Sequence, residues 1–190
     1  MIETTKWTTE QFKAEVNYQG YDHDRLNVIF IITDDIKDCL TKQGLEGSTP
    51  GCWTHSIEGS PDSIYVYPPG IPVGYESEAL AHEIQHAKFH AVLQEFQKQF
   101  RAGRKFENIC VTFAVLDQEQ LLAEVEPISD YLGHFIAEYK LGSAGVDKLL
   151  VIDETLAVMA QLHNRTGILQ GSKLWKQFYN TINKLYEEIK

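Results

Sequence analysis

Cysteine is scarce in this chain of 190 residues, and none of its three cysteines belongs to a C-x-x-C motif. The scattered positions of Cys39, Cys52 and Cys110 argue against a disulfide framework and against a thiolate zinc site. Long apolar runs are also missing, since no stretch approaches the roughly 20 apolar residues that a membrane-spanning helix needs. The polar segment from Met1 to Lys6 holds no signal core, so we expect a soluble, cytoplasmic protein.

Positive charge is in short supply as well. The chain has 17 Lys and Arg residues against 27 Asp and Glu residues, a formal net charge of -10. Such an acidic protein repels phosphate backbones and anionic lipid head groups, which disfavours nucleic acids and membranes as partners. A hydrophobic share of 43% and a charged share of 23% are those of an ordinary globular protein with one sizeable core.

The hydrophobic pattern changes along the chain from strand-like to helix-like. Apolar, β-branched or alternating runs predict strands at 25–33, 52–57 and 63–67. Helical periodicity predicts helices at about 8–18, 34–40, 76–101, 118–141, 144–164 and 173–189. The first of these helices begins with a capping box, Thr8 with Gln11.

Strands followed by helices favour an α+β fold class. We expect a small mixed sheet and the central helix in an N-terminal lobe, 1–103, and a helical C-terminal lobe, 104–190. Because Pro68 and Pro69 follow the strand predicted at Ser63–Tyr67, that strand suits the edge of the sheet or a strand terminus.

Two histidines, His82 and His86, lie four residues apart in the helix predicted at 76–101. Residues with this spacing project from one helix face, so both imidazoles can reach one Zn²⁺ at about 2.0–2.1 Å. Glu83, beside the first ligand, can take a proton from a water that zinc activates. Apolar neighbours predict a buried helix, where two histidines without partners would be costly. The run H-E-I-Q-H therefore predicts a catalytic zinc site.

A catalytic zinc ion takes three protein ligands and keeps one position open. His90 does not qualify, because its position eight residues after His82 lies about 12 Å along the helix. In the helix predicted at 118–141, Glu126 and Asp130 share one face. Glu126 can bind zinc there, and Asp130 can accept the second N–H of a ligand histidine.

Pro127 leaves alternatives open for the third ligand. A proline directly after Glu126 either kinks that helix or marks its first turn. Glu124 is therefore a reserve third ligand. The pair Asp153-Glu154, on the next predicted helix, is a weaker reserve.

The two motifs, H-E-x-x-H at 82–86 and E-x-x-S-D-x-x-G at 126–133, resemble those of the gluzincins, the thermolysin-like zinc metallopeptidases. The resemblance implies a shortened zincin-like fold. It also implies a site with zinc on His82, His86 and Glu126, Glu83 as the base and Asp130 as the residue that orients the first histidine. His163 begins a run similar to the family's H-x-N-S-G-I segment, which implies a role in stabilising the oxyanion.

The predicted function is hydrolysis of peptide bonds by a zinc metallopeptidase acting on a peptide or protein. Tyr65 and Tyr67, on the predicted edge strand, are candidate substrate-binding residues. Two alternatives remain: an inactive zincin-like domain that binds or regulates other proteins, and a helical interaction protein with an accidental motif. The presence of Glu83 favours the enzyme, because an inactive relative has no need of a general base.

Overall fold

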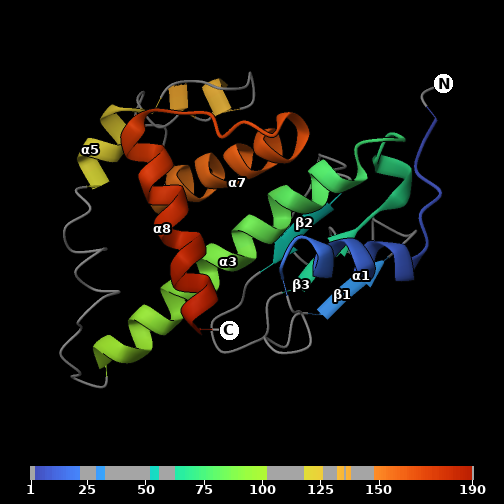
Figure 1. Cartoon of the computed structure of the whole chain (residues 1–190), viewed down its shortest axis with the longest axis horizontal. Coiled ribbons are helices and arrows are strands. Elements are labelled where there is room, and N and C mark those ends of the chain that lie inside the picture. Colours follow the sequence, from blue (N-terminus) through green and yellow to red (C-terminus); the bar gives the residue numbers. More distant parts are fainter. Residues whose placement is uncertain are drawn as a thin grey trace. The chain divides into compact units, whose positions relative to one another are not determined.

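The structure is a computed structural model that describes residues 3–21, 29–32, 52–55, 63–101, 118–125, 132–134, 136–137 and 148–189. The chain forms two compact units, Met1–Ala87 and Lys88–Lys190. Helix α3, Glu76–Arg101, passes from the first unit into the second and carries the H-E-x-x-H motif (Figure 1). The expected division into lobes at residue 103 stays a prediction.

The first unit contains a three-stranded sheet of β1 (Ile29–Ile32), β2 (Cys52–His55) and β3 (Ser63–Val66). The strand order is β1-β3-β2, with β3 parallel to β1 and antiparallel to β2. Each strand lies within a range that the sequence predicts, so the positions of the three strands are confirmed. The strands are short, at four residues each.

The expected place of β3 at the sheet edge is wrong. β3 is the central strand, because Tyr65 lies opposite Ile31 of β1 on one side and opposite Trp53 of β2 on the other. The prolines after β3 form the short 3-10 helix η1, Pro68–Gly70, and so they end the strand without exposing its edge. A peptide therefore cannot pair with β3 along a free edge.

Helix α1, Thr9–Tyr18, begins with the predicted capping box. The Gln11 backbone N–H donates to Thr8 Oγ1 at 3.3 Å, and the Thr8 backbone N–H donates to Gln11 Oε1 at 2.8 Å. Each side chain thus satisfies a backbone donor that the helix itself leaves without a partner. Phe12 and Val16, one turn apart on the opposite face, are buried in the first unit.

Helix α3 begins after a turn at Gly74, whose φ of 87° lies in the left-handed region that glycine tolerates. The Gly74 backbone N–H donates to Glu76 Oε2 at 2.7 Å. Glu76 and Glu78 place negative charge in the first turn, where it interacts favourably with the helix dipole. The observed bounds of α3 confirm the helix predicted at 76–101.

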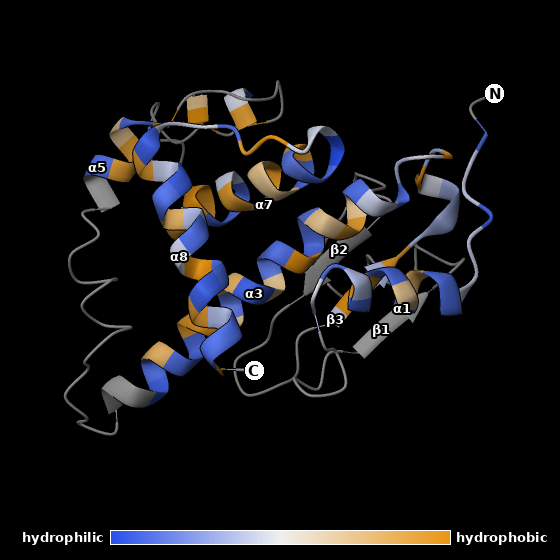
Figure 2. Ribbon diagram, in the orientation of Figure 1, coloured by the Kyte–Doolittle hydropathy of each residue, from blue (hydrophilic) through white to orange (hydrophobic). Residues whose placement is uncertain are grey.

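The second unit is helical in its described part, with α5 (Gln118–Ala123), α7 (Lys148–Thr166) and α8 (Lys173–Ile189). Hydrophobic and hydrophilic residues alternate along α8, as in an amphipathic helix (Figure 2). Its buried face consists of Trp175, Phe178, Ile182, Leu185 and Tyr186. The Trp175 indole N–H donates to the Leu121 carbonyl of α5 at 3.1 Å, which joins α5 to α8.

The expected α+β fold class is wrong, because the described chain is mostly helical. Helices α3, α7 and α8 have 26, 19 and 17 residues, whereas the strands have only four residues each. The helix expected at 118–141 is also not continuous, since α5 ends at Ala123. The helix expected at 34–40 lies outside the described residues. None of the described helices has the length and apolar character that crossing a bilayer requires.

We predict that Thr8→Ala lowers the free energy of unfolding by about 1 kcal/mol, the usual cost of removing a threonine cap. The Gln11 backbone N–H would lose its acceptor, and the capping box would lose one of its two hydrogen bonds. Urea unfolding followed by circular dichroism measures the change. Lys13→Ala, an exposed substitution in the same helix, is the control. Equal stability of Thr8→Ala and the wild type would contradict the role of the cap.

Candidate metal centre

The histidines of the H-E-x-x-H motif lie side by side on α3. His82 Nε2 and His86 Nε2 are 3.1 Å apart, and the two ring centroids are 4.8 Å apart with a near-perpendicular angle of 75° between the planes. His86 is buried, with 8% of its surface exposed, and His82 is half-buried. The Nε2 atoms therefore converge, and each Nδ1 lies on the other side of its ring.

The distance between the two Nε2 atoms suits a shared metal ion. Two nitrogen ligands of a tetrahedral zinc ion, each about 2.0–2.1 Å from it, are about 3.3 Å from one another. The observed 3.1 Å lies close to that value. The same distance also suits a hydrogen bond between two neutral imidazoles, so the case for a metal depends on the third donor.

Glu154 of α7 supplies that third donor. One ligand atom from each of His82, His86 and Glu154 lies within 4.8 Å of the other two. Two imidazoles and one carboxylate are the ligands of a common type of catalytic zinc site, which leaves a fourth position for water or substrate. Glu154 is half-buried, so its carboxylate gains more from a cation than it would in open solvent. The donor set is one that zinc takes, and the three ligand atoms lie close enough together to form a candidate metal site.

Glu83 stands beside this cluster on α3. Its side chain is buried, with 6% exposure, and its sequence neighbours Leu80, Ala81, Ile84 and Ala87 are also buried. Successive residues of an α-helix diverge by about 100°, so Glu83 flanks the histidines and does not share their face. That is the position the sequence predicts for a base next to a metal ion.

A contact between α3 and α7 accompanies the cluster. His90 Nε2, two turns after His82, lies 3.0 Å from Asp153 Oδ2. Asp153 directly precedes Glu154 in α7. Both residues of this contact belong to the second unit.

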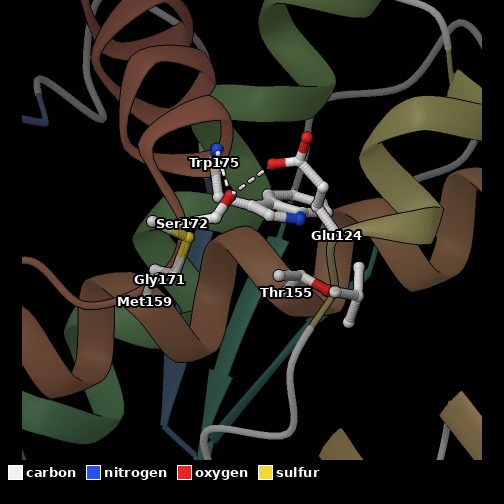
Figure 3. A pocket seen from close by; sticks show the side chains of 7 residues that line it. Glu124, Thr155, Met159, Gly171, Ser172 and Trp175 are labelled. Atoms are coloured by element: carbon white, nitrogen blue, oxygen red, sulfur yellow. Dashed lines mark hydrogen bonds between the residues drawn. The ribbon is translucent and has the colours of Figure 1, made fainter.

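The reserve ligand Glu124 is engaged elsewhere. Ser172 Oγ donates to Glu124 Oε2 at 3.0 Å, next to the N-terminus of α8. Figure 3 shows the Glu124 side chain directed toward Ser172, at a small pocket also lined by Thr155, Met159, Gly171 and Trp175. Among the described residues, the histidine cluster takes its carboxylate from Glu154 and not from Glu124.

Other predicted site residues lie elsewhere or outside the described part. Glu126 and Asp130 lie outside the described residues, so their roles stay predictions. His163 is exposed in the last turn of α7, nine residues after Glu154 and therefore about 13 Å along the helix. Its carbonyl accepts from the Gly167 backbone N–H at 2.8 Å, at the end of the helix. The structure does not bring His163 to the cluster.

The two tyrosines proposed for substrate binding belong to the central part of the sheet. Tyr65 is half-buried within β3, and Tyr67, also half-buried, directly follows it. Because β1 and β2 flank β3, pairing of a peptide with this strand is not available to either residue. The expected pairing of a substrate peptide along this strand is therefore wrong, whereas a role of Tyr65 and Tyr67 in substrate binding stays a prediction.

The sequence holds a signal for Glu154 that spacing alone does not reveal. Asp153 and Glu154 are the only charged residues in the apolar run 149–160 of α7. Charged groups in a buried helix are costly unless they are paired or bind a cation. Their position therefore marks the point where α7 meets polar partners.

We compared the chain with models of protein families, with curated proteins and with solved structures. No family model, no curated protein and no solved structure matches the chain significantly. The assignment of a function therefore depends on the site itself.

We predict that the purified chain binds one zinc ion, and that His86→Ala and Glu154→Gln each remove it. Loss of a direct ligand should weaken zinc binding by more than the roughly 10–100-fold that is typical of losing an outer-shell partner. Elemental analysis after reconstitution and dialysis measures the zinc content.

Glu124→Gln is the matched control, since it makes the same chemical change in a glutamate that bonds to Ser172. It should keep the full zinc content. Glu126→Gln tests the other candidate ligand in the same experiment. Retention of zinc by Glu154→Gln together with its loss from Glu126→Gln would contradict the site on α3 and α7.

Proposed function

We propose that this chain is a zinc-dependent metallopeptidase that hydrolyses peptide bonds. The observation that carries the proposal is the cluster of three ligand atoms, one each from His82, His86 and Glu154, that lie within 4.8 Å of one another. A glutamate as third ligand is also what the resemblance to gluzincins implies, although here it comes from α7. The buried Glu83 on the same helix supplies the acid–base group that a hydrolase needs.

His82, His86 and Glu154 would hold the ion. When bound, zinc acts as a Lewis acid that polarises a carbonyl and makes water more acidic. Two neutral imidazoles and one carboxylate leave one positive charge on the complex, which favours the build-up of negative charge on the substrate oxygen. The burial of His86 keeps bulk water from weakening that electrostatic effect.

Glu83 would transfer the proton. Its carboxylate accepts a proton from the attacking water, whose oxygen forms the new bond to the peptide carbonyl carbon. When the C–N bond breaks, the same proton passes from Glu83 to the leaving amine nitrogen. The products are a carboxylic acid and an amine, and Glu83 returns to its starting state.

The inactive zincin-like domain is the second candidate. It would share the zinc ligands but would not need Glu83. Glu83 is present and buried at 6% exposure, next in sequence to His82 on α3, where the general base of a hydrolase would stand. This favours the enzyme.

We predict that Glu83→Gln keeps the zinc ion and lowers peptidase activity by about 100- to 10,000-fold, the usual contribution of a general acid–base group. The amide matches glutamate in size but cannot accept the proton. Cleavage of fluorescein-labelled casein by the zinc-loaded chain provides the assay, and elemental analysis checks the metal.

Glu95→Gln is the matched control, because Glu95 lies on the same helix and pairs with Lys98 at 3.2 Å. It should retain full activity. Undiminished activity in Glu83→Gln would exclude Glu83 as the base. A wild-type chain that binds zinc and leaves casein and a peptide library uncut would favour the inactive domain.

A further inference from the structure

His90 continues the line of histidines on α3 but cannot bind the same ion as His82. It follows His82 by eight residues, which is about 12 Å along the helix. Its Nε2 atom lies 3.0 Å from Asp153 Oδ2 instead. The side chain of His90 is 26% exposed and that of Asp153 is 9% exposed, so this contact is largely screened from water.

The contact constrains the backbone that carries Glu154. Asp153 and Glu154 are consecutive in a continuous helix, so their Cα atoms are about 3.8 Å apart and move together. A buried aspartate is costly unless it is paired, which favours the conformation in which it meets His90. With Asp153 held on α3, α7 can neither slide along its axis nor rotate about it without breaking this bond.

We propose that His90 and Asp153 form a latch between α3 and α7 that positions Glu154 for the ion held by His82 and His86. The inference rests on the zinc site proposed above. His90 is thus a positioning residue and not a ligand, and it acts through Asp153 on the third ligand. The two consecutive acidic residues of α7 have different partners, one on the protein and one on the metal.

A second polar contact on α3 provides the control for a purely structural role. Lys88 Nζ donates to Asn183 Oδ1 of α8 at 3.3 Å and lies 5.5 Å from the centroid of the Tyr186 ring. Like the latch, this contact joins α3 to another helix within the second unit. It does not involve α7, so its loss should affect stability without affecting the position of Glu154.

The test is the zinc dissociation constant of the full chain, measured by competition with a chromogenic chelator. We expect His90→Ala to raise this constant by about 10- to 100-fold while one zinc still binds at saturation. His90→Gln should restore most of the affinity, because the glutamine Nε2 can take the place of the histidine Nε2 and donate to Asp153. Lys88→Met should leave the dissociation constant unchanged while lowering the melting temperature.

Asp153→Asn gives an independent measurement if His90→Ala proves unstable, since asparagine keeps the size of aspartate but removes its charge. Far-UV circular dichroism checks that each variant is folded. We expect Asp153→Asn to weaken zinc binding less than His90→Ala. The double variant His90→Ala/Asp153→Ala should have the same zinc dissociation constant as His90→Ala alone, because both residues act through one contact.

Three results would overturn the latch. They are a wild-type dissociation constant in His90→Ala, equal weakening in Lys88→Met, and a changed Co²⁺ absorption spectrum in His90→Ala, which would make His90 a ligand. Failure of the zinc site itself looks different, since His86→Ala and Glu154→Gln would then bind zinc as tightly as the wild type. Weak binding in those two variants with normal binding in His90→Ala would reject the latch alone.

Discussion

The burial of polar side chains along α3 is the constraint on which the site depends. This helix has the apolar residues Leu80, Ile84 and Val92 in the core, yet it also carries Glu83 and His86 at under a tenth of their full exposure. Burying such groups is favourable only where hydrogen bonds or a metal ion replace the lost water. For His86, the candidate cluster with His82 and Glu154 offers such a metal site, and His90 lies 3.0 Å from Asp153 of α7.

The part of the site that is local in sequence was predictable. The spacing of His82 and His86 fixes their shared face through the helical repeat, so the run of five residues at 82–86 suffices to infer the pair. The proposed third donor is different, since Glu154 follows His86 by 68 residues in the sequence and no local spacing relates the two. Sequence spacing could rank it only among several acidic residues, and it ranked Glu126 and Glu124 higher.

The difference between local signals and long-range packing also explains which parts of the fold could be predicted from the sequence. The bounds of α3 and α8 follow from helical periodicity, and α3 also has acidic residues in its first turn. These signals act over a few residues, and both helices are where the sequence predicts them. The strands also lie in their predicted ranges. Their order depends on pairing between distant segments, and the prolines after β3 indicate only where the strand ends. The predicted α+β class is wrong because it rested on the number of strands, and the observed strands are much shorter than the helices.

Two neighbouring acidic residues in one helix cannot serve the same point in space. Side chains at consecutive helical positions diverge by about 100°, so Asp153 and Glu154 leave α7 in different directions. On α3, His86 and His90 are four residues apart, which is about 6 Å along the axis. The carboxylates of Asp153 and Glu154, which leave adjacent positions in different directions, can therefore reach two partners separated by this distance. One carboxylate cannot both bond to His90 and bind a cation beside His82 and His86, whereas two consecutive carboxylates can divide these roles as proposed above. In the sequence, this pair is recognisable as the run D-E in an apolar helix.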